Sequence, residues 1–167
     1  MSLIADMARA ARLALPTLAA APTAQKALAI RTAADAIRAR SEELLSANAT
    51  DVAAATAAGM TPALVDRLAL DAGRVTAVAG GVTAVAGLAD PVGAVIARWS
   101  QPNGLQFERV RVPLGVIGII YESRPNVTAD AAALCLKSGN AAILRGGTEA
   151  VHSNRAIYAA LRAGLIK

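Results

Sequence analysis

Apolar residues recur at steps of three and four positions through residues 1–90, and this spacing predicts a region built of helices. The most regular repeat lies between Ile30 and Leu45, and it predicts one helix that begins after a cap at Thr23. We expect the remaining boundaries at polar and small residues, with Asn48 capping a third helix, Gly59 ending it, Thr61-Pro62 opening a fourth and Asp71 capping a fifth.

The N-terminal segment has two interpretations. Arg9 and Arg12 precede an apolar stretch, residues 13–21, in the order typical of a secretory signal peptide. Pro16 interrupts that stretch and Asp6 lies where a signal peptide carries only positive charge, so we expect an N-terminal helix instead. No window reaches the length of about 18 strongly apolar residues that a spanning helix needs, so we expect no membrane contact and a cytoplasmic setting.

The pattern changes to that of strands after Asp90-Pro91. Residues 92–99 and 105–112 are strand candidates, and the residues between them, 101–104, read Gln-Pro-Asn-Gly, which is typical of a tight turn. These features predict a β-hairpin. Trp99 and Phe107 flank the turn, and we expect their rings to pack across it.

A strand, helix, strand, helix order follows in residues 113–167. The continuous apolar run of residues 115–120 predicts a strand covered on both faces, and residues 141–145 predict a second one. Helices are expected at residues 128–137 and after Gly147, through Leu161. This order predicts a βαβ unit with two parallel strands, and therefore an α/β fold behind a helical N-terminal region.

Composition excludes several classes of protein. The chain has 167 residues with 17 basic and 12 acidic side chains, a net charge of +5. It has no basic run longer than Arg109-Val-Arg111 and only 2% aromatic residues, so we expect no nucleic-acid partner. The single cysteine excludes a disulfide scaffold, and Cys135 with His152 cannot make a four-ligand zinc site, so no metal is expected.

Candidate chemistry lies in the two loops that follow the predicted strands, residues 121–128 and 145–149, because ligands of parallel sheets bind beyond the carboxyl ends of the strands. Gly146-Gly147 lets a ligand approach the backbone or simply makes a turn. Arg145 is suited to holding a phosphate, or is a solvated surface residue. Asn126 is suited to donating a hydrogen bond to a developing oxyanion, or it closes the turn.

The two residues with reactive side chains are expected to be inert. Cys135 lies between Leu134 and Leu136 with no base nearby in the sequence, which favours a buried thiol. His152 has no partner of a metal site or catalytic triad, so we expect it to be exposed or to take part in helix capping.

Two long segments resemble the gamma-glutamyl phosphate reductase family of the aldehyde dehydrogenase superfamily. They are residues 111–128, RVPLGVIGIIYESRPNVT, and residues 134–149, LCLKSGNAAILRGGTE. Residues 66–70 and 88–93 are similar to the same family, so the resemblance covers essentially the whole chain. It implies an aldehyde-dehydrogenase-like, Rossmann-type cofactor-binding domain and the NADPH-dependent reduction of L-glutamate 5-phosphate to glutamate 5-semialdehyde, a step of proline biosynthesis.

The resemblance also implies roles for individual residues. Asn126 matches the oxyanion-hole asparagine, and Ser123 and Arg124 lie in the loop that passes the nicotinamide. The residues that match the adenosine-ribose site are Arg145, Gly146, Gly147 and Glu149, with Arg145 the candidate for the 2′-phosphate of NADP(H). The hairpin, residues 92–112, resembles the arm used for homo-oligomerisation, and the activity implies a further association with a glutamate 5-kinase.

By this resemblance residues 1–167 form the N-terminal part of the NADP-binding domain, divided into 1–90, 91–112 and 113–167. The nucleophilic cysteine of the family, which attacks the acyl phosphate before hydride transfer, lies in a catalytic domain beyond Lys167. We therefore expect the 167-residue chain alone to be inactive. The alternatives are a non-catalytic nucleotide-binding or interaction module derived from that enzyme, and part of a larger synthase that includes a kinase region.

Overall fold

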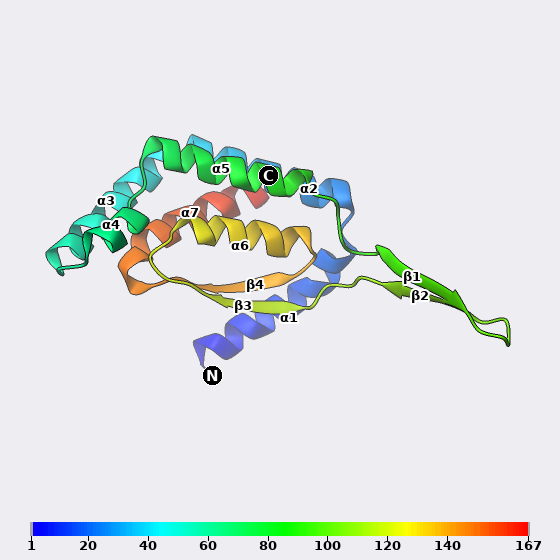
Figure 1. Cartoon of the computed structure of the whole chain (residues 1–167). Coiled ribbons are helices and arrows are strands. Elements are labelled where there is room, and N and C mark those ends of the chain that lie inside the picture. The colour runs from blue at the N-terminus through cyan, green and yellow to red at the C-terminus, as the bar shows by residue number, and fades with distance from the viewer. Residues whose placement is uncertain (1, 167) are drawn as a thin grey trace.

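A computed structural model describes residues 2–166 of the chain (Figure 1). Its elements, in order, are α1 (Leu3–Ala20), α2 (Thr23–Ala39), α3 (Ser41–Ala57), α4 (Pro62–Leu68), α5 (Ala72–Gly87), β1 (Val95–Ser100), β2 (Gln106–Val110), β3 (Val116–Ile120), α6 (Asn126–Lys137), β4 (Ala141–Arg145), the 3-10 helix η1 (Thr148–Ala150) and α7 (Val151–Leu165). The helical N-terminal region, the hairpin and the strand-helix-strand order are confirmed.

The helix predicted from Thr23 to Leu45 is in fact two helices. Arg40, with φ −106° and ψ 24°, leaves the helical conformation, so α2 ends at Ala39 and α3 begins at Ser41. The apolar repeat continues across this one-residue break, which is why the pattern alone indicated a single helix. Asn48 therefore lies inside α3 and does not cap its start, and Thr23 is the first helical residue with Pro22 at the capping position.

Other boundary predictions are confirmed. The Asp71 carboxylate accepts a hydrogen bond of 2.6 Å from the backbone N–H of Arg74 and caps α5. Gly59 follows α3 with φ +76°, a conformation that favours glycine. Pro62 begins α4, where its missing N–H costs no hydrogen bond.

The N-terminal segment forms a helix, α1, that continues through Pro16. Within residues 2–166 no single helix has the length and apolarity needed to cross a membrane, although α4 and α5, bent by 55°, meet those criteria as a pair.

The core lies where α2, α5, α6 and α7 pack together. Alanine keeps the helix axes close, and larger aliphatic side chains fill the space between them. The large aliphatic residues of this core that are at most 2% exposed are Ile30, Ile37, Leu44, Val75, Val82 and Ile157. Figure 1 shows α6 on one face of the small sheet and α1 on the other, with α2 and α5 beyond α6.

The sheet consists of β3 and β4, which pair in parallel with Val116 opposite Ala141 and Ile120 opposite Arg145. The strand β3 forms as predicted, but the prediction that both its faces are buried is wrong, because β3 is only half-buried and Ile120 is 74% exposed. Among residues 2–166 no further strand pairs with either outer edge, so the strands stay partly exposed although α1 and α6 lie on the two faces of the sheet.

The hairpin projects from this body as an arm (Figure 1). Its strands pair antiparallel, with an irregularity between Val95 and Ala97. The expected contact across the turn is confirmed, since the rings of Trp99 and Phe107 stack with centroids 5.4 Å apart. Every residue of the two strands except Ala97 is exposed, so the arm has its apolar side chains in solvent.

Candidate functional site

The loops that follow β3 and β4 are joined by one side chain. The backbone N–H and the hydroxyl of Ser123 both donate to Oε1 of Glu149, at 2.5 Å and 2.9 Å. Ser123 has φ +45°, the only positive value at a non-glycine residue among residues 2–166. The two loops therefore share one edge of the sheet, with Ser123 held in a conformation that few residues adopt.

The Glu149 carboxylate is stabilised in its charged form. Burial opposes its ionisation, but its own backbone N–H, the two bonds from Ser123 and the charge of Arg145 outweigh burial and lower the pKa of Glu149 below its ordinary value. The link between the loops is consequently a charge-assisted one at neutral pH.

Gly146 and Gly147 lie directly beneath side chains that a Cβ would displace. A Cβ on Gly147 would overlap the Glu149 carboxylate, and one on Gly146 would overlap the side-chain amide of Asn154. Neither glycine has a positive φ, so the backbone conformation alone does not call for glycine here. Glycine is favoured at both positions because side chains of this chain occupy the space where a Cβ would lie, and the sequence pattern did not reveal this.

Arg145 and Arg124 present free positive charge at this edge. Both are exposed, and neither guanidinium has a hydrogen bond or ion pair with any residue of the described range, 2–166. Arg145 nevertheless lies close enough to Glu149 to affect its ionisation. A guanidinium without an internal partner is available to an anionic ligand.

Asn126 is the first residue of α6, and the expectation that it belongs to the preceding loop is corrected. Its Nδ2 donates to Oδ2 of Asp130, one turn along the helix, at 3.0 Å. One hydrogen of the amide is therefore committed to Asp130, and the other remains for a ligand.

Asn126 lines a cavity of about 550 Å³ between the α4–α5 connection and α6. The charged residues around it are Asp66, Arg67, Arg74, Arg124 and Asp130. Residues 66–70 contributed to the family resemblance, but no sequence pattern places Arg67 beside Asn126, whereas Asp130 lies one turn further along α6. The proximity of Arg67 depends on the packing of α5, which follows α4, against α6.

Cys135 and His152 are as expected. Cys135 is buried, and burial raises the pKa of its thiol. It lines a separate, largely apolar cavity of about 560 Å³ bordered by α1, α7 and β4. His152 is exposed, and its backbone N–H donates to Asp51, which caps α7 from α3. No group of three His, Cys, Asp or Glu residues within 2–166 is arranged to hold a metal ion.

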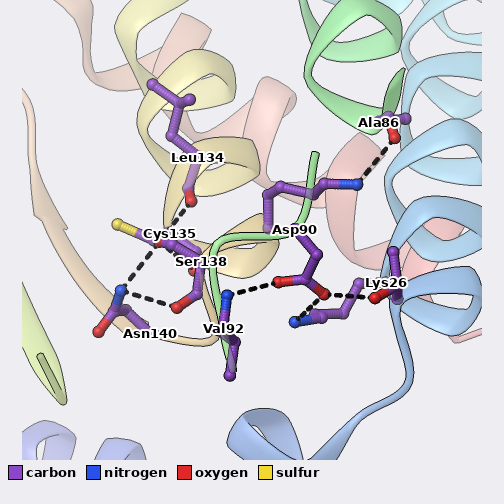
Figure 2. A network of polar contacts seen from close by, with 10 residues as sticks. Lys26, Ala86, Asp90, Val92, Leu134, Cys135, Ser138 and Asn140 are labelled. Carbon is purple, nitrogen blue, oxygen red and sulfur yellow. Dashed lines mark hydrogen bonds and ion pairs between the residues drawn. The ribbon is translucent and has the colours of Figure 1, made fainter. Parts of the chain in front are cut away.

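Buried polar contacts fix the root of the arm (Figure 2). Lys26 pairs with Asp90 at 2.6 Å, and Asp90 also accepts hydrogen bonds from Thr23 and from the Val92 N–H. Burial opposes ionisation of Asp90, but these bonds, led by that of Lys26, lower its pKa. Lys137 donates to the carbonyl of Ala86 at the end of α5. The chain entering the arm is thus anchored to α2 and α6.

No protein-family model matches the chain. Curated proteins named gamma-glutamyl phosphate reductase do: that of Parvibaculum lavamentivorans is 57% identical over 98% of this chain, that of Rhizorhabdus wittichii 63% over 98% and that of Sphingopyxis alaskensis 62% over 99%. The chain spans 38–39% of the length of these relatives.

Solved structures show the same similarity. The gamma-glutamyl phosphate reductase of Thermotoga maritima superimposes with a TM-score of 0.95 at 45% identity, covering 99% of this chain and 40% of its own. The Saccharomyces cerevisiae protein of that name gives 0.94 at 34% identity, covering 99% and 42%. A Corynebacterium glutamicum benzaldehyde dehydrogenase, at 0.73 and 21% identity over 93% and 31%, shows the same fold.

Proposed function

We propose that this chain supplies the cofactor-binding and oxyanion-binding residues of a gamma-glutamyl phosphate reductase, to whose N-terminal part it is related over its whole length. The reaction is the NADPH-dependent reduction of L-glutamate 5-phosphate to glutamate 5-semialdehyde and phosphate, in proline biosynthesis. The observation that carries the proposal is the position of Asn126. Its half-buried amide lines a charged cavity to which the loop after β3 contributes Arg124.

The residues at this edge fit a phosphorylated dinucleotide. Arg145 offers an unpaired guanidinium for the 2′-phosphate of NADPH, which would favour NADPH over NADH. Glu149 fills the space over Gly147, so its carboxylate, rather than bare backbone, would accept hydrogen bonds from ribose hydroxyls. Ser123 and Arg124 belong to the other loop and would border the nicotinamide.

The chain's own contribution to the reaction is electrostatic. NADPH, when bound, supplies the hydride. The free N–H of Asn126 would stabilise the oxyanion that forms when the acyl carbon becomes tetrahedral, an effect worth about 3–4 kcal/mol per donor. Cys135 is unsuited to act as nucleophile because it is buried and its pKa is raised. We infer that a thiolate from outside these 167 residues attacks the acyl carbon and that phosphate leaves with the electrons of the broken C–O bond.

The proposal extends to partners and location. The arm, residues 92–112, presents exposed apolar side chains and is proposed to pair with a second copy of the protein. Association with a glutamate 5-kinase would pass the labile acyl phosphate directly to this site. A single free thiol suits the reducing cytoplasm.

A chimaeric reductase tests the proposed function. Residues 1–167 replace the matching segment of the Parvibaculum lavamentivorans relative, to which they are 57% identical. Expressed in a bacterium that lacks its own gamma-glutamyl phosphate reductase, the chimaera is expected to restore growth without proline, as the unaltered relative does. A stable, soluble chimaera that fails to restore growth would contradict the proposal.

A further inference from the structure

The cavity beside Asn126 has an uneven distribution of charge. Three arginines and two aspartates surround it, and two of the five are already paired with each other. Arg74 contacts the Asp66 carboxylate at 2.9 Å and also donates to the backbone carbonyls of Asp66 and Ala69. Arg74 therefore has a structural role, because it holds the end of α4 against the start of α5.

Arg67 differs from Arg74 although both line the same cavity. Its guanidinium has no hydrogen bond or ion pair within residues 2–166. It lies in the last turn of α4, one residue from Leu68, which is fully buried. Its backbone is thus fixed while its charge remains available to a ligand.

Hydrogen bonds from Asn48 of α3 fix the connection between α4 and α5, directly after Arg67. This buried amide donates to the carbonyl of Leu68 at 2.9 Å and accepts from the N–H of Leu70 at 2.6 Å. Asn48 is itself bonded to Ser153 of α7, at 2.9 Å. A buried side chain that satisfies two backbone groups of a short connection makes that connection rigid, which lowers the entropy cost of binding a ligand there.

Asp130 provides the opposite charge on the other wall. Its Oδ2 accepts from Asn126, whereas its Oδ1 has no donor among residues 2–166 and lies against Gly81, where an added Cβ would be 3.4 Å away. Ala77, Val78 and Gly81 of α5 form a small, mostly apolar floor between the two charges. An aliphatic α-amino acid needs a positive group for its carboxylate, a negative group for its ammonium and an apolar surface for its side chain, and this cavity has all three.

We propose that this cavity binds the amino-acid end of the substrate, with Arg67 on the α-carboxylate and Oδ1 of Asp130 on the α-ammonium group. The inference rests on the proposed function, and it names the residues that make the site specific for an acyl phosphate bearing an α-amino acid. The acyl carbon then lies toward Asn126, which lines the same cavity. An exposed arginine near the C-terminal end of a helix also stabilises the helix dipole, so the test must separate recognition from stability.

The chimaeric reductase is assayed with L-glutamate 5-phosphate and two shortened substrates. The compound 4-aminobutanoyl phosphate lacks the α-carboxylate, and glutaryl phosphate lacks the α-ammonium group. Arg67→Ala is expected to raise KM for L-glutamate 5-phosphate by about 10-fold to 100-fold, the effect of losing a hydrogen bond to a charged group, and to leave KM for 4-aminobutanoyl phosphate within about twofold. Asp130→Asn is expected to raise KM for L-glutamate 5-phosphate but not for glutaryl phosphate.

Control variants separate loss of recognition from loss of fold. Arg31→Ala removes an exposed arginine of α2 that lines neither cavity and should change no KM. Thermal unfolding of each variant identifies loss of fold, and Arg67→Gln provides a milder second variant. An Arg67 variant that is folded and loses activity equally on the full and shortened substrates, or loses none, would overturn the inference alone. An inactive unmutated chimaera would overturn the proposed function and the inference together.

Discussion

The side-chain amide of Asn126 and the carboxylate of Asp130 face each other across the first turn of α6, with 3.0 Å between Nδ2 and Oδ2. Asp130 in turn lies against Gly81 of α5. The orientation of the amide is therefore set by helix packing before any substrate binds, as electrostatic stabilisation of an oxyanion requires.

Replacing Asn126 should affect the chemical step. In the chimaeric reductase Asn126→Ala is expected to lower kcat by about 100-fold to 1000-fold, because one oxyanion donor is lost. The dissociation constant for NADPH, measured by fluorescence titration, should stay within twofold of the unmutated value. A kcat within threefold of the unmutated chimaera would limit Asn126 to its structural bond with Asp130.

Arg145 should decide between the two nicotinamide cofactors. Arg145→Ala is expected to weaken NADPH binding by about 10-fold or more, because a charge-assisted bond to the 2′-phosphate is lost, and to leave NADH binding unchanged. Titration of both cofactors into the chimaera measures this. Equal weakening of both would remove Arg145 from the 2′-phosphate, and Arg31→Ala serves as the matched control.

The bond between Glu149 and Ser123 should protect one backbone amide from hydrogen exchange. Glu149→Ala is expected to speed exchange at Ser123, and Gly147→Ala should do the same because its Cβ displaces the Glu149 carboxylate. The pKa of Glu149 is lowered in the fold, so the link is complete above the ordinary pKa near 4.5 and is lost as the pH falls through the lower folded value. Unchanged exchange in both variants would show that the loops are held by other contacts.

The buried pair of Lys26 and Asp90 should stabilise the fold. Asp90→Ala leaves Lys26 buried without a partner and is expected to cost about 3–5 kcal/mol in the free energy of unfolding. Because Lys26→Met with Asp90→Ala removes both charges, the double variant should lose less than the sum of the single variants. Urea unfolding of all four proteins measures the difference, and strict additivity would contradict the pairing.

The same pair makes stability depend on pH. The pKa of Asp90 in the fold lies below its ordinary value of 3.8, so its contribution is full above that value and declines as the pH falls through the lower folded pKa. Asp90→Ala should remove this part of the acid sensitivity.

The order of elements could be predicted from the sequence because it depends on local patterns. The hydrophobic periodicity indicated helices, the Asn-Gly turn indicated the hairpin, and β4 has the predicted bounds, Ala141–Arg145. The break at Arg40 was missed because α2 and α3 bury faces that continue the same apolar repeat. Burial of β3 was overestimated, since a run of apolar residues does not reveal how many strands lie beside it.

The site was predictable only in part. Asn126, Ser123 and Arg145 were predicted from the loops and the family resemblance, and their roles stay predictions. The network of Asn48, Asp51 and Ser153 was not, because Ser153 is more than 100 residues from the other two and meets them only through packing of α3 against α7. Such long-range polar contacts have no periodic signature, and the same is true of Arg67 beside Asp130.

The central claim is that these residues provide cofactor and oxyanion contacts for a reductase whose nucleophile lies outside them. The most direct measurement compares NADPH oxidation by the 167-residue chain with that by the chimaeric reductase, in the presence of L-glutamate 5-phosphate. We expect turnover from the chimaera and none from the chain alone. Turnover by the chain alone, or a folded chimaera that binds NADPH without reducing the acyl phosphate, would contradict the account.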